Sequence, residues 1–453
     1  MKAKIVVVSI FLIIIALLGC ITSVGRLGGS YNVAENTAIA DDWVKEGLYQ
    51  RAIKKYKEVI EHKSSEEIYV KMFDAYEKHY LEDISILDEY IESLILAVAE
   101  YPKNVDFNKA IINYCIIDSD YESAYKYAKS AVDNIRDNDE IENLKTQVQY
   151  YVSLRTREYQ NFLPCNNGIY TVKAKDKWGT IYSDGSSRDE FGYEYINSAG
   201  EDNIQIFTTS KGSTLLDNEL SVLGKFSSKI LDAGIFNEGL VPVKIDDKFC
   251  YVDEFAKKQF GDFEIGGSFN DGIAAVKKGG KWYFIDDKGE KISKEYFDIK
   301  VDENYSYTRD TYIVVAEKEG QYYLCDDNFE KISNVYEDMD IDYGGLIAVK
   351  ENGKWGFIDA DGEVVIKPTY ENAKSFSNGL AAVCVDGFWG FINSDNKIVI
   401  ECAYSDAYYF NGDGTCMVKT LVVETETDEE GNEVEVEYQL CRLLELKLGI
   451  LEN

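Results

Sequence analysis

The sequence contains little histidine and little proline. Its 453 residues include two histidines, His62 and His79, which lie 17 positions apart. A His-dependent catalytic triad, or a metal site with several His ligands, is therefore excluded from the rest of the chain. Proline occurs four times, against 34 Tyr and 21 Phe. A chain this rich in aromatic residues is expected to fold, largely as half-buried strands.

Motifs for metal or nucleotide chemistry are also missing. The stretches "DADGE" at 359–363 and "NGDGT" at 411–415 lack the alternating ligand spacing of a calcium loop. "GGKW" and "GKWG" lack the Lys-Ser/Thr ending of a phosphate loop. We therefore predict no catalytic residue, no metal and no cofactor. A carboxylate pair for glycoside hydrolysis depends on spatial separation, so the sequence leaves that alternative open.

The cysteines are dispersed and form no CxxC pair. They are Cys20, Cys115, Cys165, Cys250, Cys325, Cys384, Cys402, Cys416 and Cys441. Because Cys250, Cys325 and Cys384 lie in apolar runs, we expect buried free thiols. One or two disulfides are the alternative.

The chain is strongly acidic, with a formal net charge of −33. A surface of this charge repels phosphate backbones, so nucleic-acid binding is not expected. The charge favours solubility and does not by itself identify a partner.

The first residues predict attachment to a membrane. Residues 5–24, "IVVVSIFLIIIALLGCITSV", form an uncharged run of 20 after the basic start "MKAK", which is the length that a membrane-spanning helix needs. Within it "LLGC" ends at Cys20 and resembles the lipobox of bacterial lipoproteins, in which this cysteine is lipidated. We expect 1–26 to be an uncleaved signal anchor, with a lipoprotein signal or a released protein as alternatives. All three place the remaining chain outside the cytoplasm of a bacterium.

Helical spacing follows a linker expected at 27–40 and extends over 41–160. "WVKEGLYQRAIKKYKEVIE" places Ala52 and Tyr56 on one helix face, and "SDYESAYKYAKSAVDNI" repeats the arrangement around Ala124. Small residues at these offsets let two helices approach closely. The pattern is similar to the second half of a tetratricopeptide unit. A plain helical bundle is the alternative.

From about residue 165 the periodicity becomes alternating and one motif recurs. Its reference positions are separated by 33 to 40 residues. In one copy the position is occupied by Thr214, and in the others by the aromatic residues Trp178, Phe249, Trp282, Tyr322, Trp355 and Trp389. A glycine lies ten residues before most of them, at Gly168, Gly239, Gly272, Gly345 and Gly379. A fixed period of this length indicates one stacked supersecondary unit over 165–450, in about seven to eight copies.

Each copy reads as three to four short strands. An apolar strand such as "LAAV" is followed by a polar turn and a second strand, "WGFID", which predicts a β-hairpin. "DADG", "DDKG" or "YSDG" then predicts a tight turn before a third strand. At 415–443 Val and Glu alternate on both sides of "DEEGN", so we interpret this segment as an eighth copy with a lengthened hairpin and Tyr438 near the Trp position. A disordered acidic loop is the alternative.

The units "GLAAVCVDGFWGFINSDNKIVI" and "GLIAVKENGKWGFIDADGEVVIKPTY" resemble the WG repeat of bacterial proteins. Gly follows Trp at Gly179, Gly356 and Gly390 but is replaced by Tyr283 and Tyr323 in other copies. The resemblance implies a β-repeat array, often in an exported protein, and no established catalytic residue. A closed propeller protects strand edges best, and an open β-solenoid is the alternative.

Two repeat regions and no clustered chemistry predict a protein that binds and does not catalyse. We expect a membrane-anchored scaffold at a bacterial cell surface with a protein or peptide partner, and a glycan as a less favoured ligand. The repeat aromatics are expected to pack between units, with a stacking surface for ligands as the alternative. A cell-envelope protein that binds or hydrolyses carbohydrate is the competing hypothesis.

Overall fold

The computed structural model describes residues 31–200, 203–427 and 433–449. The chain divides into two compact units, 1–141 and 142–453, and each is described by itself. The apolar run 5–24 and Cys20 lie outside the described residues, so the predicted anchor is not tested. Within the described ranges, no helix combines the length and apolarity that crossing a bilayer requires.

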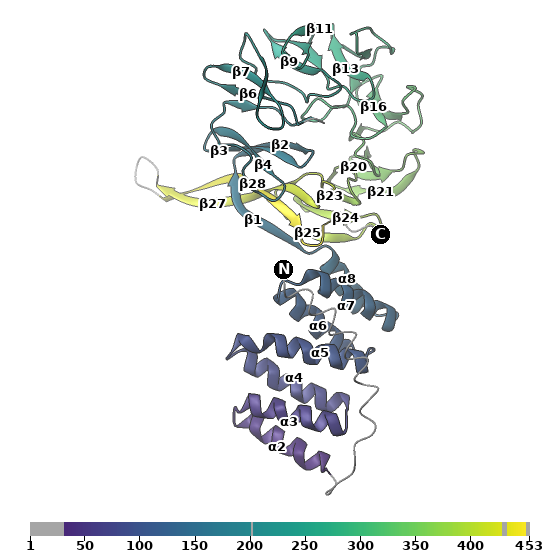
Figure 1. Cartoon of the computed structure of the whole chain (residues 1–453). Helices are drawn as coiled ribbons and strands as arrows, with labels where there is room; N and C mark the ends of the chain where they lie inside the picture. Colours follow the sequence, from purple (N-terminus) through teal and green to yellow (C-terminus); the bar gives the residue numbers. More distant parts are fainter. Residues whose placement is uncertain (1–30, 201–202, 428–432, 450–453) are drawn as a thin grey trace. The chain divides into compact units, whose positions relative to one another are not determined.

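The first unit is built of helices that pack one after another along the chain (Figure 1). They are α2 (Val33–Lys45), α3 (Tyr49–His62), α4 (Glu66–Tyr80), the short 3-10 helix η1 (Ile84–Ile86), α5 (Leu87–Glu100), α6 (Val105–Ile117) and α7 (Tyr121–Asn134). The next helix, α8 (Asp139–Gln149), crosses the boundary between the ranges of the two units. Side chains of Asn32, Ser65, Asn104 and Asp120 accept backbone N–H bonds at the first turns of α2, α4, α6 and α7, which favours helix starts at these residues. The predicted linker 27–40 is too long, because α2 already begins at Val33.

Small residues let the helices of this unit approach closely. In α3 Ala52 is fully buried beside Tyr56, and in α7 Ala124 is fully buried. Asp41 of α2 accepts hydrogen bonds from Tyr56 Oη (2.6 Å) and from Lys71 Nζ of α4 (2.9 Å). One carboxylate thus ties three successive helices together.

The second unit consists of small antiparallel sheets (Figure 1). The first five in chain order are β2 (Asn161–Asn166), β3 (Ile169–Ala174), β4 (Lys177–Tyr182); β5 (Tyr195–Ile196), β6 (Gln205–Thr209), β7 (Gly212–Leu216), β8 (Val222–Lys225); β9 (Val241–Ile245), β10 (Lys248–Val252), β11 (Lys258–Phe263); β12 (Ile265–Gly266), β13 (Ile273–Lys278), β14 (Lys281–Asp286); and β15 (Asp298–Ile299), β16 (Ile313–Ala316), β17 (Tyr322–Cys325). The next two are β18 (Asp338–Met339), β19 (Ile347–Glu351), β20 (Lys354–Ile358), β21 (Val364–Tyr370); and β22 (Asn372–Ala373), β23 (Leu380–Val385), β24 (Phe388–Asn393), β25 (Ile398–Tyr404). The eighth joins β26 (Asp406–Ala407), β27 (Thr415–Thr427) and β28 (Glu433–Leu446) to the first strand of the unit, β1 (Val152–Tyr159).

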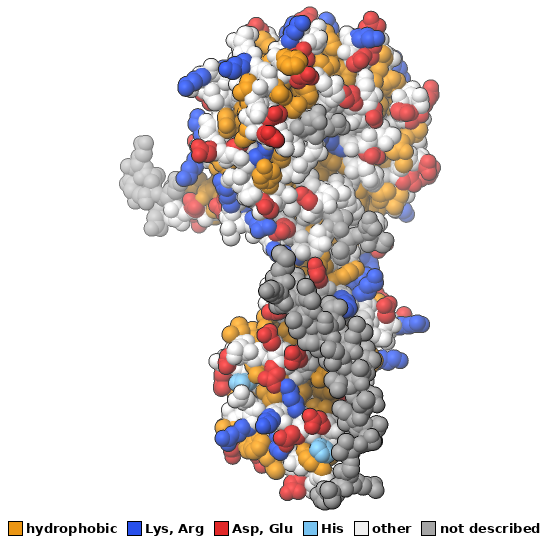
Figure 2. Space-filling model, viewed as in Figure 1, with side chains coloured by type: hydrophobic (Ala, Val, Ile, Leu, Met, Phe, Trp, Pro, Cys, Tyr) orange, Lys and Arg blue, Asp and Glu red, His pale blue; other side chains and the backbone are white. Residues whose placement is uncertain are grey.

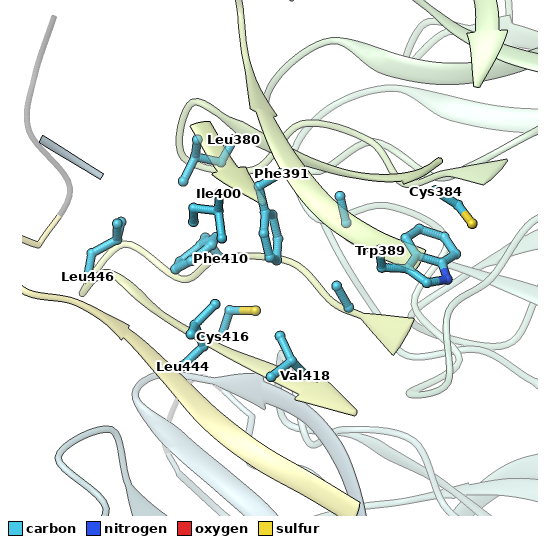
Figure 3. Packing of buried hydrophobic residues seen from close by; sticks show 12 residues of the cluster. Leu380, Cys384, Trp389, Phe391, Ile400, Phe410, Cys416, Val418, Leu444 and Leu446 are labelled. Atoms are coloured by element: carbon cyan, nitrogen blue, oxygen red, sulfur yellow. The ribbon is translucent and has the colours of Figure 1, made fainter. Parts of the chain in front are cut away.

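The sheets form a closed ring, because a buried apolar cluster joins each sheet to the next. One cluster packs Tyr159 and Leu443 of the eighth sheet against Tyr170 of the first. On the other side of the eighth sheet, Cys416 and Leu444 pack with Phe391 of the seventh (Figure 3). Six further clusters join the remaining neighbours in order. The unit is therefore a β-propeller of eight sheets, as the closed-ring prediction required, and not an open solenoid.

Paired residues with positive φ set hairpin turns in several copies. The turn before the first long strand uses pairs such as Asn378 and Gly379, at φ 52° and 80°, and the turn before the Trp strand uses pairs such as Asp386 and Gly387. Two successive positive φ values define the type I′ turn that matches strand twist. Gly168, Gly239 and Gly272 occupy the same place as Gly379, with φ between 72° and 81°. In the copy that contains Gly345, the positive φ of 81° belongs to its neighbour Gly344, whereas a Cβ on Gly345 would lie 2.7 Å from Phe376 Cβ.

Two further expectations differ from the structure. Strand β1 lies inside the range 41–160 that was expected to be helical. These residues form a strand because they pair with β28, which is distant in the sequence. The segment at 415–443 does form the lengthened hairpin of an eighth copy, which projects from the ring (Figure 1). By register, however, Cys441 and not Tyr438 takes the Trp position, and Ser213 and not Thr214 takes it in the second sheet.

Candidate functional site

The repeat aromatics lie at one end of their sheets, beside the hairpin turns. Trp355 pairs with Lys350, which pairs with Asp338 of the short strand β18. The same register places Trp389 opposite Cys384 and Asn372 of β22, and Tyr322 opposite Ala316 and Asp298 of β15. In each of these sheets, the first residue of the short strand and the aromatic residue are aligned across the sheet. Their side chains therefore lie on the same face of the sheet.

A pocket of about 570 Å³ opens among the short strands of four neighbouring sheets. Because β18, β22, β26 and the segment directly after β15 all contribute to it, these short strands are the innermost ones and the pocket lies on the ring axis. Its walls combine charged, aromatic and apolar side chains from Lys300, Val301, Asp302, Glu303, Asp338, Met339, Asp340, Ile341, Trp355, Asn372, Ala373, Lys374, Trp389, Asp406, Tyr408 and Tyr409. We call this the axial pocket.

Both lysines of the axial pocket are already held by groups of the protein. Lys374 Nζ lies 3.5 Å from the centroid of the Tyr408 ring and 5.2 Å from that of Trp389, and donates to the Ala407 carbonyl (2.6 Å). Its ion pair with Asp406 is 3.4 Å long. Lys300 Nζ pairs with Asp338 (2.6 Å) and lies 4.5 Å from the ring centroid of Tyr322. Aromatic faces and carboxylates together stabilise an ammonium group.

Two carboxylates of the pocket have no such cation. Asp340 Oδ2 accepts from the Ser375 backbone N–H and from Tyr409 Oη, both at 2.7 Å. Glu303 lies closer to solvent than Asp340. Desolvation raises the pKa of both carboxyl groups above the usual range. The charges of Asp302 and Asp340 raise the pKa of Glu303 further, whereas the charge of Lys374 lowers the pKa of both groups.

The floor of the pocket is closed by stacked rings and a buried ion pair. Tyr343 and Tyr409 stack with ring centroids 3.5 Å apart and an interplanar angle of 12°. Beside them Arg309 donates from Nε and Nη2 to Asp302 Oδ2, at 2.8 and 2.5 Å. Both Arg309 and Tyr343 also line a smaller cavity beyond the floor. The ring axis is therefore blocked at this level, and the pocket opens at one end.

An insertion in one copy supplies this block. The interval of 40 residues between Trp282 and Tyr322 contains a long segment between β15 and β16. In it Asn304 accepts from Ser198 Oγ (2.7 Å), its carbonyl accepts from Ser268 Oγ (2.9 Å), and Tyr305 Oη donates to Asp232 (2.7 Å). The segment thus reaches the inner strands of three other sheets across the ring.

The helical unit has a separate groove of about 200 Å³ between α3, α4 and α5. Its lining includes Lys57, Tyr69 and Leu96, and Leu96 is 50% exposed. Lys57 pairs with Glu89 (2.7 Å) at its edge. The two histidines lie on this unit, in α3 and α4 (Figure 2).

The structure brings only part of the predicted repeat set to the site. Trp355 and Trp389 line the axial pocket, whereas Phe249 and Trp282 are buried in clusters between sheets, and Trp178 packs with a similar cluster. The prediction that the repeat aromatics pack between units is therefore confirmed for most of them. Sequence analysis missed the acidic first positions of the short strands, Asp298, Asp338 and Asp406, whose spacing follows the repeat period.

Neither the cysteines nor the carboxylates form a metal site in the described part of the chain. No group of three or more His, Cys, Asp or Glu side chains is placed there to hold a metal ion. The eight described cysteines are free thiols, six of them buried. Desolvation raises the pKa of the Cys416 thiol to about 12, which disfavours the reactive thiolate.

Comparison with known proteins identifies the repeat. The family model described as "WG containing repeat" matches residues 262–282, 324–355, 355–387 and 389–420. No curated protein matches the chain. 

Among solved structures, the chain is similar to BamB from Moraxella catarrhalis (10% identity, 67% of this chain, 99% of that chain, TM-score 0.39). It is also similar to KlHsv2 with loop 6CD replaced by a Gly-Ser linker (9%, 63%, 99%, 0.37) and to a eukaryotic initiation factor (12%, 64%, 91%, 0.38). Similarity at this level carries no functional argument. Three of the four matched segments, from residue 324 onward, include residues of the axial pocket, whereas 262–282 lies in the third and fourth sheets, which do not line it. The chain therefore carries WG containing repeats between residues 262 and 420.

Proposed function

We propose that the chain is a scaffold protein that binds a protein or peptide partner at the axial pocket of its propeller. The observation that supports this most directly is the pocket itself, about 570 Å³ in volume and blocked at its floor. A closed ring with a single-ended pocket can receive a side chain of a partner while the surrounding hairpin turns contact the rest of it.

The pocket suits a peptide better than a glycan. Sugar rings stack on free aromatic faces, but Lys374 lies over Trp389 at 5.2 Å and Lys350 lies over Trp355 at 6.0 Å. Both Trp side chains are only 8% exposed. A sugar would have to displace these lysines before it could stack, so the glycan is the less favoured ligand.

Carbohydrate hydrolysis is the second candidate, because Glu303 and Asp340 share one pocket and both have a raised pKa. A general acid with a raised pKa beside a second carboxylate is the arrangement that glycosidases use. Against it, Asp340 is engaged by the Ser375 N–H and by Tyr409. We therefore propose binding without catalysis.

The helical unit offers a second surface in this proposal. Its successive helical hairpins resemble tetratricopeptide units, and such arrays bind peptides in their grooves. The groove beside Leu96 and Tyr69 is lined by apolar, aromatic and charged groups. A partner could therefore engage both units.

The test is co-purification of the full-length protein, extracted in an uncharged detergent, with partners from envelope extract. Glu303→Gln should lose a partner that enters the axial pocket, while Asp287→Asn, an exposed carboxylate outside the pocket, should retain it. Leu96→Glu probes the groove, with Leu81→Glu, at an 85% exposed leucine, as its control. Recovery of no stoichiometric partner, together with glycan turnover that Asp340→Asn abolishes in a folded protein, would replace binding with hydrolysis.

Location is part of the proposal, supported by the run 5–24. If it spans the membrane, Cys20→Ala protein should stay membrane-bound at unchanged size, since about 20 apolar residues hold a helix in a bilayer. Protease added outside intact cells should then cleave the repeats. Accumulation of a larger precursor and loss of lipid labelling in the variant would establish a lipoprotein, and protection of the repeats would contradict the orientation.

A further inference from the structure

We infer that the axial pocket recognises the cationic side chain of a lysine or arginine in the partner, held between Glu303 and Asp340. This rests on the proposed function and specifies its ligand. It follows from the charges that line the pocket, from the contacts that hold Lys374 in it, and from the two carboxylates that form no ion pair within the described residues.

Carboxylates outnumber cations around the pocket. The lining contains five carboxylates, from Asp302, Glu303, Asp338, Asp340 and Asp406, against two ammonium groups, from Lys300 and Lys374. Arg309 below the floor and Lys419, which pairs with Asp406 at 3.2 Å, are two further cations. An excess of one negative charge remains, and the chain as a whole carries −33, so the long-range field also attracts cations.

Each of these cations already has a carboxylate partner, and Lys374 and Lys419 share Asp406. Lys300 pairs with Asp338 (2.6 Å), Lys374 with Asp406 (3.4 Å) and Arg309 with Asp302 (2.5 Å). An anionic ligand would have to break one of these pairs. A cationic ligand meets no such cost, because within the described residues no Lys, Arg or His forms an ion pair with Glu303 or Asp340.

The pocket already shows how it holds an ammonium group. Lys374 Nζ sits over the Tyr408 ring at 3.5 Å and near the Trp389 ring at 5.2 Å, with a carbonyl and a carboxylate as hydrogen-bond acceptors. In the same pocket, Glu303 and Asp340 provide further carboxylate acceptors, and Asp340 accepts from Tyr409 Oη. Carboxylate acceptors of this kind suit the side chains of lysine and arginine.

Desolvation of both carboxyl groups and the effect of the Asp340 charge on Glu303 support the assignment. The pKa of Asp340 is raised by burial first and lowered by its hydrogen bonds to Ser375 and Tyr409 and by the charge of Lys374. The pKa of Glu303 is raised by burial, by Asp302 and by Asp340 itself. A cation that enters between them would relieve this repulsion, so the free pocket favours binding one.

The experiment measures binding of blocked pentapeptides to the full-length protein in an uncharged detergent. The probes are acetyl-Gly-Gly-Lys-Gly-Gly-amide and its arginine, norleucine and glutamate counterparts, followed by calorimetry and by the fluorescence of the pocket tryptophans. Norleucine keeps the length of lysine and removes the charge. The variants are Glu303→Gln and Asp340→Asn, with Asp287→Asn as the matched control and circular dichroism as the check on folding.

We expect the lysine and arginine peptides to bind at least about tenfold more tightly than the norleucine peptide, with affinity falling as salt rises. Glu303→Gln should reduce binding of the cationic peptides about tenfold, and Asp287→Asn should not. Because Asp340→Asn disturbs hydrogen bonds, the exposed Glu303 decides the result if the Asp340 variant misfolds.

Three results would overturn the inference: equal binding of lysine and norleucine peptides, preference for the glutamate peptide, or no binding of either cationic peptide at about 1 mM. In each case a partner still recovered by co-purification, and lost in Glu303→Gln, would leave the proposed function standing with a different ligand. Failure of both experiments would remove the proposed function as well.

Discussion

The glycine that follows Trp in the repeat can be tested by adding one methyl group. A Cβ built on Gly390 would lie 2.6 Å from the Ile400 carbonyl oxygen and 2.7 Å from the Cys402 nitrogen of β25. A bulge in the pairing of β24 with β25 brings this backbone over the glycine. Gly356 meets β21 in the same way, with Ile366 O at 2.5 Å. All these neighbours are backbone atoms, so the whole outer strand must move.

The expected cost of Gly390→Ala follows from that geometry. Ordinary contact begins at 3.4 Å, so β25 must shift by about 0.8 Å relative to Gly390, and overpacking of this kind costs about 1–3 kcal/mol. The lower entropy of the unfolded alanine chain offsets about 0.4–1 kcal/mol. Because the shift also strains the strand's hydrogen bonds, we expect a net loss of about 2 kcal/mol.

Urea unfolding in a Trp43→Phe background measures this loss, since Trp178, Trp282, Trp355 and Trp389 then report on the propeller alone. Gly412→Ala is the control, because its Cβ would meet only Asn378 Oδ1 at 3.5 Å and should change stability by less than about 0.5 kcal/mol. An equal effect of the two substitutions would refute the strand-crossing argument.

Further predictions concern ring closure, thiol burial and pH. Leu154→Pro should lower the melting temperature of the propeller and destabilise it by about 3 kcal/mol or more, because it removes a ladder bond of β1 and packing in the last cluster; an unchanged melting curve would show that closure contributes nothing. Cys416 should resist iodoacetamide in the native protein and react in urea, whereas the half-exposed Cys402 should react first, as mass spectrometry of the labelled peptides would show; equal labelling would contradict the buried cluster. Because burial raises the pKa of Glu303 and Asp340, both side chains lose their charge on acidification before ordinary carboxylates do. The affinity for the lysine pentapeptide should therefore already fall above pH 4.5, the usual pKa of glutamate. Calorimetry that finds constant affinity down to that pH would argue that these two groups do not hold the cation.

In two copies tyrosine replaces the glycine that follows the aromatic reference position, and this replacement shows what the sequence could and could not predict. The period and the paired turns follow from local patterns, so the repeat unit and the closed ring were predictable. The reason why Tyr283 and Tyr323 replace glycine was not predictable, because that reason lies in the neighbouring outer strand. In those two sheets only isolated bridges replace the outer strand, and the space holds the two tyrosine rings with Lys291 and Lys331 over them, each at 4.8 Å.

The axial pocket was less predictable than the ring. Glu303 and Asp340 come from different copies, and nothing in their local sequence marks them among 81 acidic residues. The long interval before Tyr322 was visible as an irregular spacing of 40, but only the closed ring turns that insertion inward. Sites built from several repeats on a common axis depend on which side chains the closed ring brings together, which a strand pattern does not specify.

The pairing of β1 with β28 also sets the order in which this protein can mature. Ser153 and Glu445 touch across 292 positions of the chain, so β1 has no partner until nearly all of the chain has been made. Until then the first and seventh sheets each expose an apolar face that the last hairpin later covers. Contacts of this range slow folding, and exposed strand edges invite pairing with other chains. During synthesis the incomplete ring therefore depends on chaperones or on rapid completion, and pairing of its final hairpin is the step that commits the domain to the native state.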